Sequence, residues 1–530
     1  MTPLTASRQP GLRPLTALAR TLPFMLPQMH PKRARAPGPT GLRVVLLVQA
    51  VVVACTLWLC LAGVAAAQAS DPPARVGHAS LLGGQVEHSW DGNTWGPASV
   101  GAPLTTQSAL RTAAQSRAEV RIGSTALRLS PDALIQFDQL DDAGVVVALH
   151  HGRLNVRLRQ WAPAGDRLAV LLDGARFDAG SAGSFHLDVD GRGLRVAARV
   201  FAGSGTLTVG TQRVPITAGQ QVLVDTQAMT VLKQGPAERR PLDDWADKRD
   251  QLAEARGERG GAALHAPAEM TGADLLDEHG AWRVDPRFGA VWFPRGVAAD
   301  WAPYRQGRWT WVAPWGWTWI DDAPWGFAPF HYGRWMFLAG RWGWLPGSVQ
   351  ARPVYAPALV GFYGNPPGGW GGAAGAPPGG VVGWYPLGPG EFYRPAGNPS
   401  PAYAQALNLA QGAQAVAPRS ASAAASHRYA QTSFAATVVP QAAFSGGQAV
   451  AASRLDVAPG TLAGAPALGS GAMPAGPAAA ARPVAEAPRP AEARPLKALR
   501  EQVKEARQAR HAERAARKAP LGASPQRTAP

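Results

Sequence analysis

The sequence predicts a mainly β protein with three parts: an antiparallel β-sandwich or barrel-like domain, a small domain of Trp-rich β-hairpin repeats, and a disordered C-terminal tail. Three observations support this fold class. Polar and apolar residues alternate through residues 74–235, a unit containing Trp and Gly recurs between residues 280 and 344, and large apolar residues become sparse after residue 396. The 60 Gly and 49 Pro among 530 residues also disfavour an architecture of long helices.

The N-terminal part of the chain is predicted to direct export. Residues 44–67 form an apolar run, seven Lys or Arg residues and no acid precede it, and Ala67-Gln68-Ala69 supplies small residues for cleavage after Ala69. The run is also long enough to span a bilayer as an uncleaved anchor, and Met25 and Met29 are alternative starts to Met1. We therefore expect the rest of the chain to be periplasmic, either free or anchored in the inner membrane.

Charge and cysteine content exclude several functions for the exported part. The net charge of +16 comes mainly from residues 1–43 and 481–530, so the nearly neutral body gives no sign of nucleic-acid binding. Both cysteines, Cys55 and Cys60, lie in the apolar run. The exported part therefore has no disulfide, cysteine nucleophile or cysteine metal ligand, and we expect neither a metal nor a cofactor.

Residues 74–235 are predicted to form the first β domain. Apolar residues alternate with charged or polar ones in the segments 117–122, 153–159 and 185–190, which places one face of each strand inward and the other in water. Gly, Asp or Pro separates such segments about every 8–12 residues, a spacing typical of antiparallel sandwiches and barrels. The polar residues of the third segment are expected to face solvent rather than to bind a metal: His186, Asp188 and Asp190.

Four segments of this domain resemble the FecR-type periplasmic domain. They are PLTTQSALRT (103–112), AEVRIGSTALRLSPDALIQF (118–137), HHGRLNVRLR (150–159) and ITAGQQVLVD (216–225). The resemblance implies a β-rich periplasmic module that receives a signal by protein–protein contact. FecR-type regulators of sigma factors also carry a cytoplasmic domain, and the 43 residues before the apolar run are too few to fold into one.

Residues 238–266 are predicted to connect the two β domains through a short helix at 242–257. Asp243 or Asp244 can cap its start, and Gly257 ends it. Its charged composition favours a spacer between domains, although three side chains could dock it on a neighbour: Trp245, Leu252 and Ala253.

Residues 267–395 are predicted to form the Trp-rich domain. Gly280-Ala281-Trp282, Gly307-Arg308-Trp309 and Gly333-Arg334-Trp335 recur at spacings of 27 and 26 residues, and each is followed by a second aromatic turn. A unit of this length fits one β-hairpin per repeat, with a weaker fourth copy at 383–386. From the acidic lead at 267 to residue 347, the block resembles a Trp/Gly-rich domain of unknown function that accompanies FecR-like domains in exported bacterial proteins. The resemblance implies an architecture but no activity.

The tryptophans of this domain are expected to form a core first and a binding surface second. Twelve indoles at about 200 Å² each have a combined surface area of roughly 2,400 Å². Soluble proteins usually expose only a few hundred Å² of contiguous apolar surface, so most of these indoles must be buried. About two to four would remain for a ligand, which we expect to be an envelope protein or a cell-wall glycan. The candidate binding residues are Trp315, Trp317 and Trp319, which share one strand face, with Arg308 and Arg334.

Catalysis is not expected. Asp321, Asp322 and Glu391 are the carboxylates in or near the aromatic block, and a glycoside hydrolase requires a pair about 5–10 Å apart across a sugar. Adjacent Asp321 and Asp322 instead fit a turn between two strands, in which carboxylates accept hydrogen bonds from backbone amides. The chain also lacks nucleophile-elbow, zinc-protease and phosphate-loop motifs.

Residues 397–530 are predicted to be a disordered tail rich in Ala, Pro and Gly, apart from a basic helix at 496–518. Taken together, the sequence indicates a non-enzymatic exported envelope protein that binds or senses through its two β domains. The alternative is a membrane-anchored signalling component of the FecR type that regulates a sigma-factor pathway, and a carbohydrate-active enzyme is a distant third. The sequence leaves the oligomeric state open.

Overall fold

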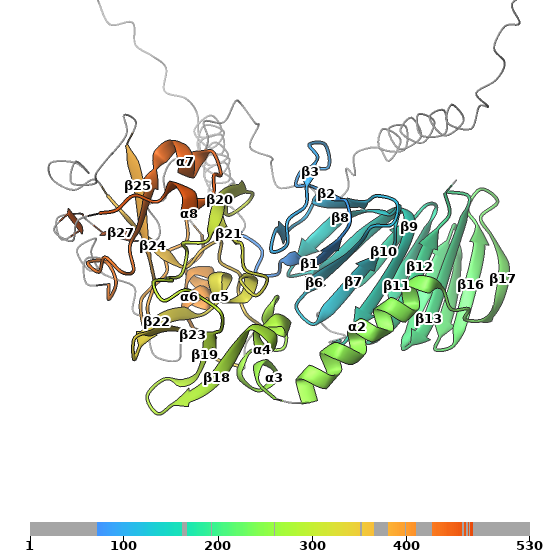
Figure 1. The fold of residues 1–530 in the computed structure, drawn as a ribbon. Coiled ribbons are helices and arrows are strands. Elements are labelled where there is room, and N and C mark those ends of the chain that lie inside the picture. The colour runs from blue at the N-terminus through green and yellow to red at the C-terminus, as the bar shows by residue number, and fades with distance from the viewer. Residues whose placement is uncertain are drawn as a thin grey trace, which may run out of the picture. The chain divides into compact units, whose positions relative to one another are not determined.

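The computed structural model describes residues 71–469, apart from 162–166, 192, 259, 350–351, 365–379, 398, 410–426, 458–460, 463–464 and 466. The predicted export segment and the basic helix at 496–518 lie outside the described residues. In the described part, antiparallel strands dominate, which confirms the mainly β fold class (Figure 1).

Two sheets that share one long strand form the first β domain. The order of the first sheet is β4 (Pro103–Leu104), β1 (Gly77–Gly83), β6 (Arg117–Ile122), β7 (Thr125–Leu129), β9 (Gly144–Leu158), β12 (Gly183–Val189), β13 (Arg195–Ala202), β16 (Gln220–Asp225) and β17 (Thr230–Pro236). The order of the second is β3 (Gly96–Pro97), β2 (Val86–Ser89), β5 (Ala109–Thr112), β8 (Leu134–Asp141), β9, β10 (Leu168–Leu172), β11 (Ala175–Ala179), β14 (Ser204–Val209) and β15 (Gln212–Thr217). The pairing of β10 with β9 is parallel, which departs from the antiparallel pattern expected.

Period-two alternation fills the space between the two sheets with apolar side chains. Val120, Leu127, Val156 and Phe185 come from four neighbouring strands and are at most 1% exposed. Residues of opposite parity on these strands face the other way, as the alternation predicts.

Helix α2 (Pro241–Glu258) lies across the strands of the first sheet (Figure 1). Its start follows from its sequence, because Pro241 needs no hydrogen-bond acceptor in the first turn and the Asp243 carboxylate accepts the backbone N–H of Arg240 at 2.7 Å. The helix was expected, but as a spacer. Instead it covers His186, which is 4% exposed, so the prediction that His186 faces solvent is wrong.

Three β-hairpins form the Trp-rich domain, one for each predicted repeat. They are β18 (Gly280–Asp285) with β19 (Gly289–Pro294), β20 (Gly307–Val312) with β21 (Gly316–Asp321), and β22 (Arg334–Leu338) with β23 (Arg341–Leu345). The first and third join in the order β18-β19-β23-β22. Short helices precede or separate them: α3 (Ala262–His265), η1 (Ala273–Leu275), α4 (Leu276–His279) and α5 (Phe327–His331).

Part of the predicted disordered tail is folded, and the boundary predicted at residue 397 is wrong. Strand β26 (Thr437–Pro440) pairs with β25 (Val381–Pro386), which pairs with β24 (Val360–Tyr363) and through it with β27 (Ala467–Gly469). Helices α6 (Pro401–Leu409), α7 (Gln441–Ser445) and α8 (Val450–Ser453) add to this layer. The few large apolar residues of the region suffice because they complete the existing Trp-rich core rather than forming one of their own.

Within these described residues, no helix combines the length and the apolar character that crossing a membrane requires.

Candidate functional site

The tryptophans of the repeat domain are mostly core, as the area argument predicts. Trp292, Trp309, Trp335 and Trp344 are at most 1% exposed and lie in one aromatic cluster. Many ring pairs meet edge to face, for example Trp309 and Trp319 with centroids 5.6 Å apart, which is the geometry that aromatic quadrupoles favour.

All three predicted binding tryptophans belong to that core, and Trp315, which is 5% exposed, is the least buried of them. Trp317 is 2% exposed and Trp319 is fully buried, so neither side chain offers a surface to a ligand. Phe444 of α7 packs on Trp317 with ring centroids 4.6 Å apart, and the Trp319 indole donates a hydrogen bond to Asp321 at 3.0 Å. Only Trp315 of the three lines a cavity.

The two predicted arginines also have structural partners. Arg334 is 1% exposed and donates hydrogen bonds to the backbone oxygens of Gly333 and Glu391 and to the Asn408 side chain, at 2.8–3.1 Å. Burial lowers its pKa to about 10. Arg308 is partly exposed and donates to Ser99 Oγ at 2.6 Å. Neither arginine lines the cavity beside Trp315, so the structure does not gather the predicted set into one site.

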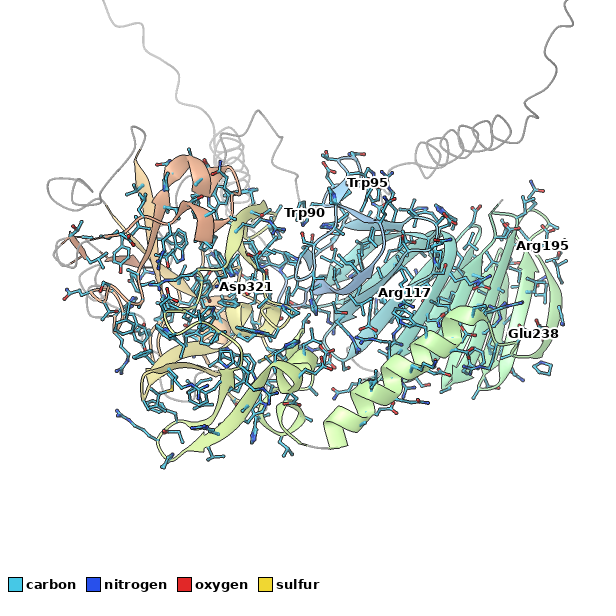
Figure 2. The ribbon with its side chains drawn as sticks, in the orientation of Figure 1. Trp90, Trp95, Arg117, Arg195, Glu238 and Asp321 are labelled. Atoms are coloured by element: carbon cyan, nitrogen blue, oxygen red, sulfur yellow. The ribbon has the colours of Figure 1, made fainter. Side chains whose placement is uncertain are left out.

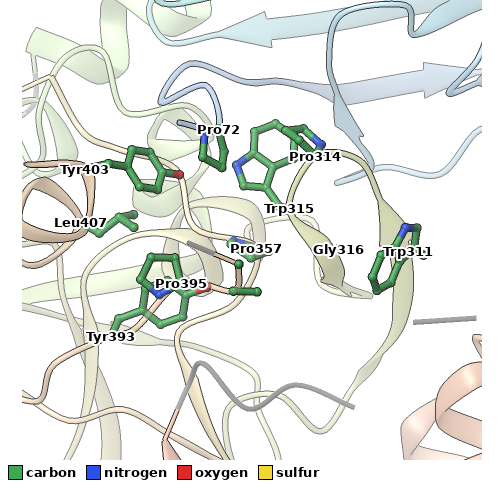
Figure 3. A pocket seen from close by; sticks show the side chains of 12 residues that line it. Pro72, Trp311, Pro314, Trp315, Gly316, Pro357, Tyr393, Pro395, Tyr403 and Leu407 are labelled. Atoms are coloured by element: carbon green, nitrogen blue, oxygen red, sulfur yellow. The ribbon is translucent and has the colours of Figure 1, made fainter. Parts of the chain in front are cut away.

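The cavity beside Trp315 has a volume of about 330 Å³ and an aromatic and proline-rich wall (Figure 3). Its lining residues come from the segment before β1, from the β20–β21 hairpin, and from residues 357–407: Pro72, Trp311, Pro314, Trp315, Gly316, Pro357, Tyr393, Pro395, Ala396, Gly397, Tyr403 and Leu407. None carries a charge. The volume is that of a small-ligand pocket, and the described lining residues offer aromatic and proline surfaces rather than ion pairs.

The β20–β21 turn positions one side of this cavity. Gly316 has a φ of +87°, a conformation that favours glycine, and an added Cβ would lie 3.3 Å from the Trp311 ring. Trp311 stands opposite Trp317 in the hairpin register and packs against it edge to face at 5.6 Å. With 45% of its surface exposed, Trp311 is the exposed indole of the described repeat region and forms the rim of the cavity.

Four aromatic residues supply the polar side-chain atoms of the wall: Trp311, Trp315, Tyr393 and Tyr403. The Tyr393 hydroxyl is buried and finds no hydrogen-bond partner among the described residues. The Trp315 indole N–H points toward the Tyr403 hydroxyl (Figure 3). Burial raises the pKa of both tyrosines well above the usual value, so both hydroxyls stay protonated and can donate as well as accept a hydrogen bond. The Tyr403 hydroxyl donates to the Tyr355 carbonyl oxygen at 3.5 Å. Sequence reasoning missed Tyr393 and Tyr403 as site residues, because Tyr403 lies in the part expected to be disordered.

Two of the three carboxylates weighed for catalysis, Asp321 and Glu391, accept hydrogen bonds from backbone amides. The Asp321 carboxylate (Figure 2) accepts the N–H of Ala323 at 2.9 Å, as the predicted turn requires. Glu391 accepts the N–H groups of Gly388 and Arg428 at 2.6 and 2.5 Å. Among the residues that the structure describes, no group of three or more potential metal ligands is found.

Comparison with known proteins identifies one part of the chain. Residues 273–391 match a family of unknown function, DUF6600, which confirms that the Trp-rich block is such a domain. No curated protein matches the chain significantly in sequence. These findings do not show the FecR family for the first domain, which stays a prediction.

Two solved structures resemble part of the fold. Both are crystal structures, at 2.50 and 1.65 Å resolution, of a Parabacteroides distasonis protein assigned as an anti-sigma factor. Identity is 13% and 12%, and the TM-score is 0.23 for each. The alignments cover 26% of this chain and 63% and 64% of the other, so the chain matches less than two thirds of that protein's length.

Proposed function

We propose that the chain is a non-enzymatic exported binding protein of the cell envelope, and that its repeat domain holds an extended, proline-rich peptide segment in the cavity beside Trp315. The observation that carries this proposal is the composition of the wall, which combines aromatic rings and prolines with no charged side chain. The location rests on the predicted export segment at residues 44–69.

The chemistry of the wall favours a peptide over a glycan. A sugar ring presents several hydroxyls that need both donors and acceptors. Among the polar side-chain atoms of this wall, the indole N–H groups only donate, and the Tyr393 and Tyr403 hydroxyls are the acceptors. Proline-rich chains in the polyproline II conformation present carbonyl acceptors, lack N–H donors at proline, and pack pyrrolidine rings on aromatic grooves. Donors with aromatic rings match that ligand directly.

The state of the carboxylates supports a non-enzymatic role. Asp321 and Glu391 accept backbone N–H groups within their own loops, and Asp322 lies 3.9 Å from Arg308. Each of these three carboxylates has a partner within the fold, and none of the three lines the cavity. The regulation of a sigma-factor pathway remains a prediction from the resemblance of the first domain.

Binding of a labelled decaproline peptide to the full chain tests the proposal by fluorescence anisotropy. We expect Trp311→Ala to weaken binding about tenfold, because loss of a stacked aromatic anchor costs on the order of 1–2 kcal/mol. Phe337→Ala is the matched control, since Phe337 is 39% exposed, lies in the same domain and does not line the cavity. Equal binding by Trp311→Ala and the parent chain would refute the site.

A second assay distinguishes the glycan alternative. The full chain and Trp311→Ala are sedimented with isolated cell-wall sacculi. Retention of the parent chain but not of Trp311→Ala, together with no decaproline binding, would assign the cavity to a glycan and overturn the peptide proposal.

A further inference from the structure

The cavity beside Trp315 contains a hydrogen-bond donor that no described residue satisfies. Tyr393 lines the cavity and is 1% exposed, and its hydroxyl has no hydrogen-bond partner among the described residues (Figure 3). A buried polar group without a partner is costly, so such groups normally meet an acceptor. The backbone carbonyl of a segment from outside the described residues would supply one.

The chain leaves the described residues on a course toward this cavity. Strand β27 ends at Gly469 and pairs antiparallel with β24, where Gly469 lies opposite Phe362. The direction past Gly469 is therefore back along β24 toward Pro357, which lies five residues before Phe362 and lines the cavity. The backbone oxygen of Pro357 also accepts the N–H of Trp319 at 3.0 Å, which fixes this part of the wall beside the β20–β21 hairpin.

The residues that follow β27 have a composition that suits the wall. Residues 470–481 read SGAMPAGPAAAA and carry no charge, as the lining residues carry none. Pro474 and Pro477 lie three residues apart, and a polyproline II helix has three residues per turn, so both rings fall on one face of such a helix. This is the spacing of the PxxP segments that dock in aromatic grooves. The later prolines of the tail stand among charges, as in Pro488-Arg489-Pro490.

The length of the chain between β27 and these prolines also fits. The five residues from Gly469 to Pro474 span up to about 17 Å when extended, at roughly 3.3–3.6 Å per residue. The same number of residues separates Phe362 from Pro357 on the antiparallel partner. Pro474 can therefore reach the level of Pro357, and Pro477 lies one polyproline turn beyond it.

We propose that residues 473–477 of this chain are an internal ligand of the cavity beside Trp315, with both proline rings on the aromatic wall and a backbone carbonyl that accepts a hydrogen bond from Tyr393. The inference rests on the proposed function, because it names an occupant of the same cavity. Three residues tether Met473 to β27, so the segment acts at an effective concentration in the mM range. With a Kd on the order of 1 mM it fills the cavity in about half to two thirds of the molecules, and an external proline-rich segment binds by displacing it.

Competition in the full chain tests the proposal. Pro474→Ala/Pro477→Ala removes both rings from a segment beyond the described residues, and Pro488→Ala/Pro490→Ala is the matched control. We expect the first variant to bind labelled decaproline two- to threefold more tightly than the parent chain, because its own segment no longer competes. The control should bind as the parent does, and fluorescence anisotropy measures both.

Methionine oxidation reports the position of the segment without an added peptide. Met473 belongs to the segment, and Met229, which is 43% exposed, is the internal reference. With hydrogen peroxide and mass spectrometry, we expect Met473 to oxidise two- to threefold more slowly relative to Met229 in the parent chain than in Trp311→Ala. The physical reason is that an aromatic wall shields the Met473 sulfur from the oxidant. Phe337→Ala should give the parent rate.

The outcomes separate this inference from the proposed function. Equal decaproline binding by the parent chain and Pro474→Ala/Pro477→Ala would overturn the inference and leave the proposed function standing. Equal tightening by Pro488→Ala/Pro490→Ala, or a Met473 oxidation rate that Trp311→Ala leaves unchanged, would overturn it as well. Absence of decaproline binding in every chain, including the variant without competing prolines, would overturn the proposed function and this inference with it.

Discussion

At the scale of single residues, the accessibility of an indole depends on what covers it from elsewhere in the chain. Trp311 and Trp317 are cross-strand neighbours on the same hairpin, yet Trp311 is 45% exposed and Trp317 is 2% exposed. Phe444 makes the difference, because it packs on Trp317 from a helix more than a hundred residues away. Strand alternation predicts which side chains share a face of the hairpin. It does not predict which residues from distant parts of the chain pack on that face.

Gly280 is a residue whose identity the aromatic core requires. A Cβ at this position would lie 2.1–2.4 Å from three atoms of the Trp292 ring, and Trp292 is fully buried and donates to Leu276 O at 2.9 Å. We expect Gly280→Ala to lower the free energy of unfolding by about 2–3 kcal/mol, measured by urea denaturation. Gly96→Ala, where a Cβ meets nothing within 4 Å, should change it by less than about 1 kcal/mol. Equal effects would show that the ring moves aside freely.

At the scale of elements, the sequence predicts the repeated β-hairpins of the Trp-rich domain but misses the later strands and helices that complete its core. The three hairpins follow from the 26–27-residue spacing, and α2 follows from its start and stop signals. Strand β26 and helix α7 were not predicted, because their composition is too poor in large apolar residues to fold alone. They fold against an aromatic surface that already exists, and no local pattern encodes that surface.

Helix α7 is expected to contribute much of its stabilisation through one ring. Phe444 is 2% exposed, and its ring centroid lies 4.6–6.0 Å from those of Trp309, Trp317 and Trp384. Phe444→Ala should lower the free energy of unfolding by about 3–4 kcal/mol and shift tryptophan emission to longer wavelength. Phe434→Ala, at a ring that is 46% exposed, is the control and should cost less than about 1 kcal/mol. An unshifted spectrum in Phe444→Ala would mean that another group refills the space.

At the scale of the whole molecule, buried neutral histidines link stability to pH. Burial lowers the pKa of His78 to about 4, that of His88 to about 4 and that of His331 to about 3. His78 stacks on Phe327 with centroids 4.4 Å apart, and His331 lies 2.8 Å from the Ala356 carbonyl oxygen through its Nδ1. Asp321 has the opposite effect on the pH dependence of stability, because burial raises the pKa of its carboxyl to about 8. A carboxyl of this kind is stabilising at low pH and loses that contribution as the pH rises.

The histidines should dominate the response between pH 6.5 and 4. In this window the unfolded chain binds protons that the folded chain excludes, so the free energy of unfolding falls as the pH falls, by up to about 2 kcal/mol per histidine at pH 5. His78→Phe keeps an aromatic ring against Phe327 and removes the titrating nitrogens, which make no hydrogen bond among the described residues. Urea denaturation at pH 7 and pH 5 should therefore show a loss of unfolding free energy about 2 kcal/mol smaller in His78→Phe than in the parent chain.

The control is His279→Gln, at a histidine side chain that is 34% exposed, and it should lose as much unfolding free energy on acidification as the parent chain. If His78→Phe loses as much stability on acidification as the parent, His78 accepts its proton in the folded state and contributes nothing to the acid sensitivity.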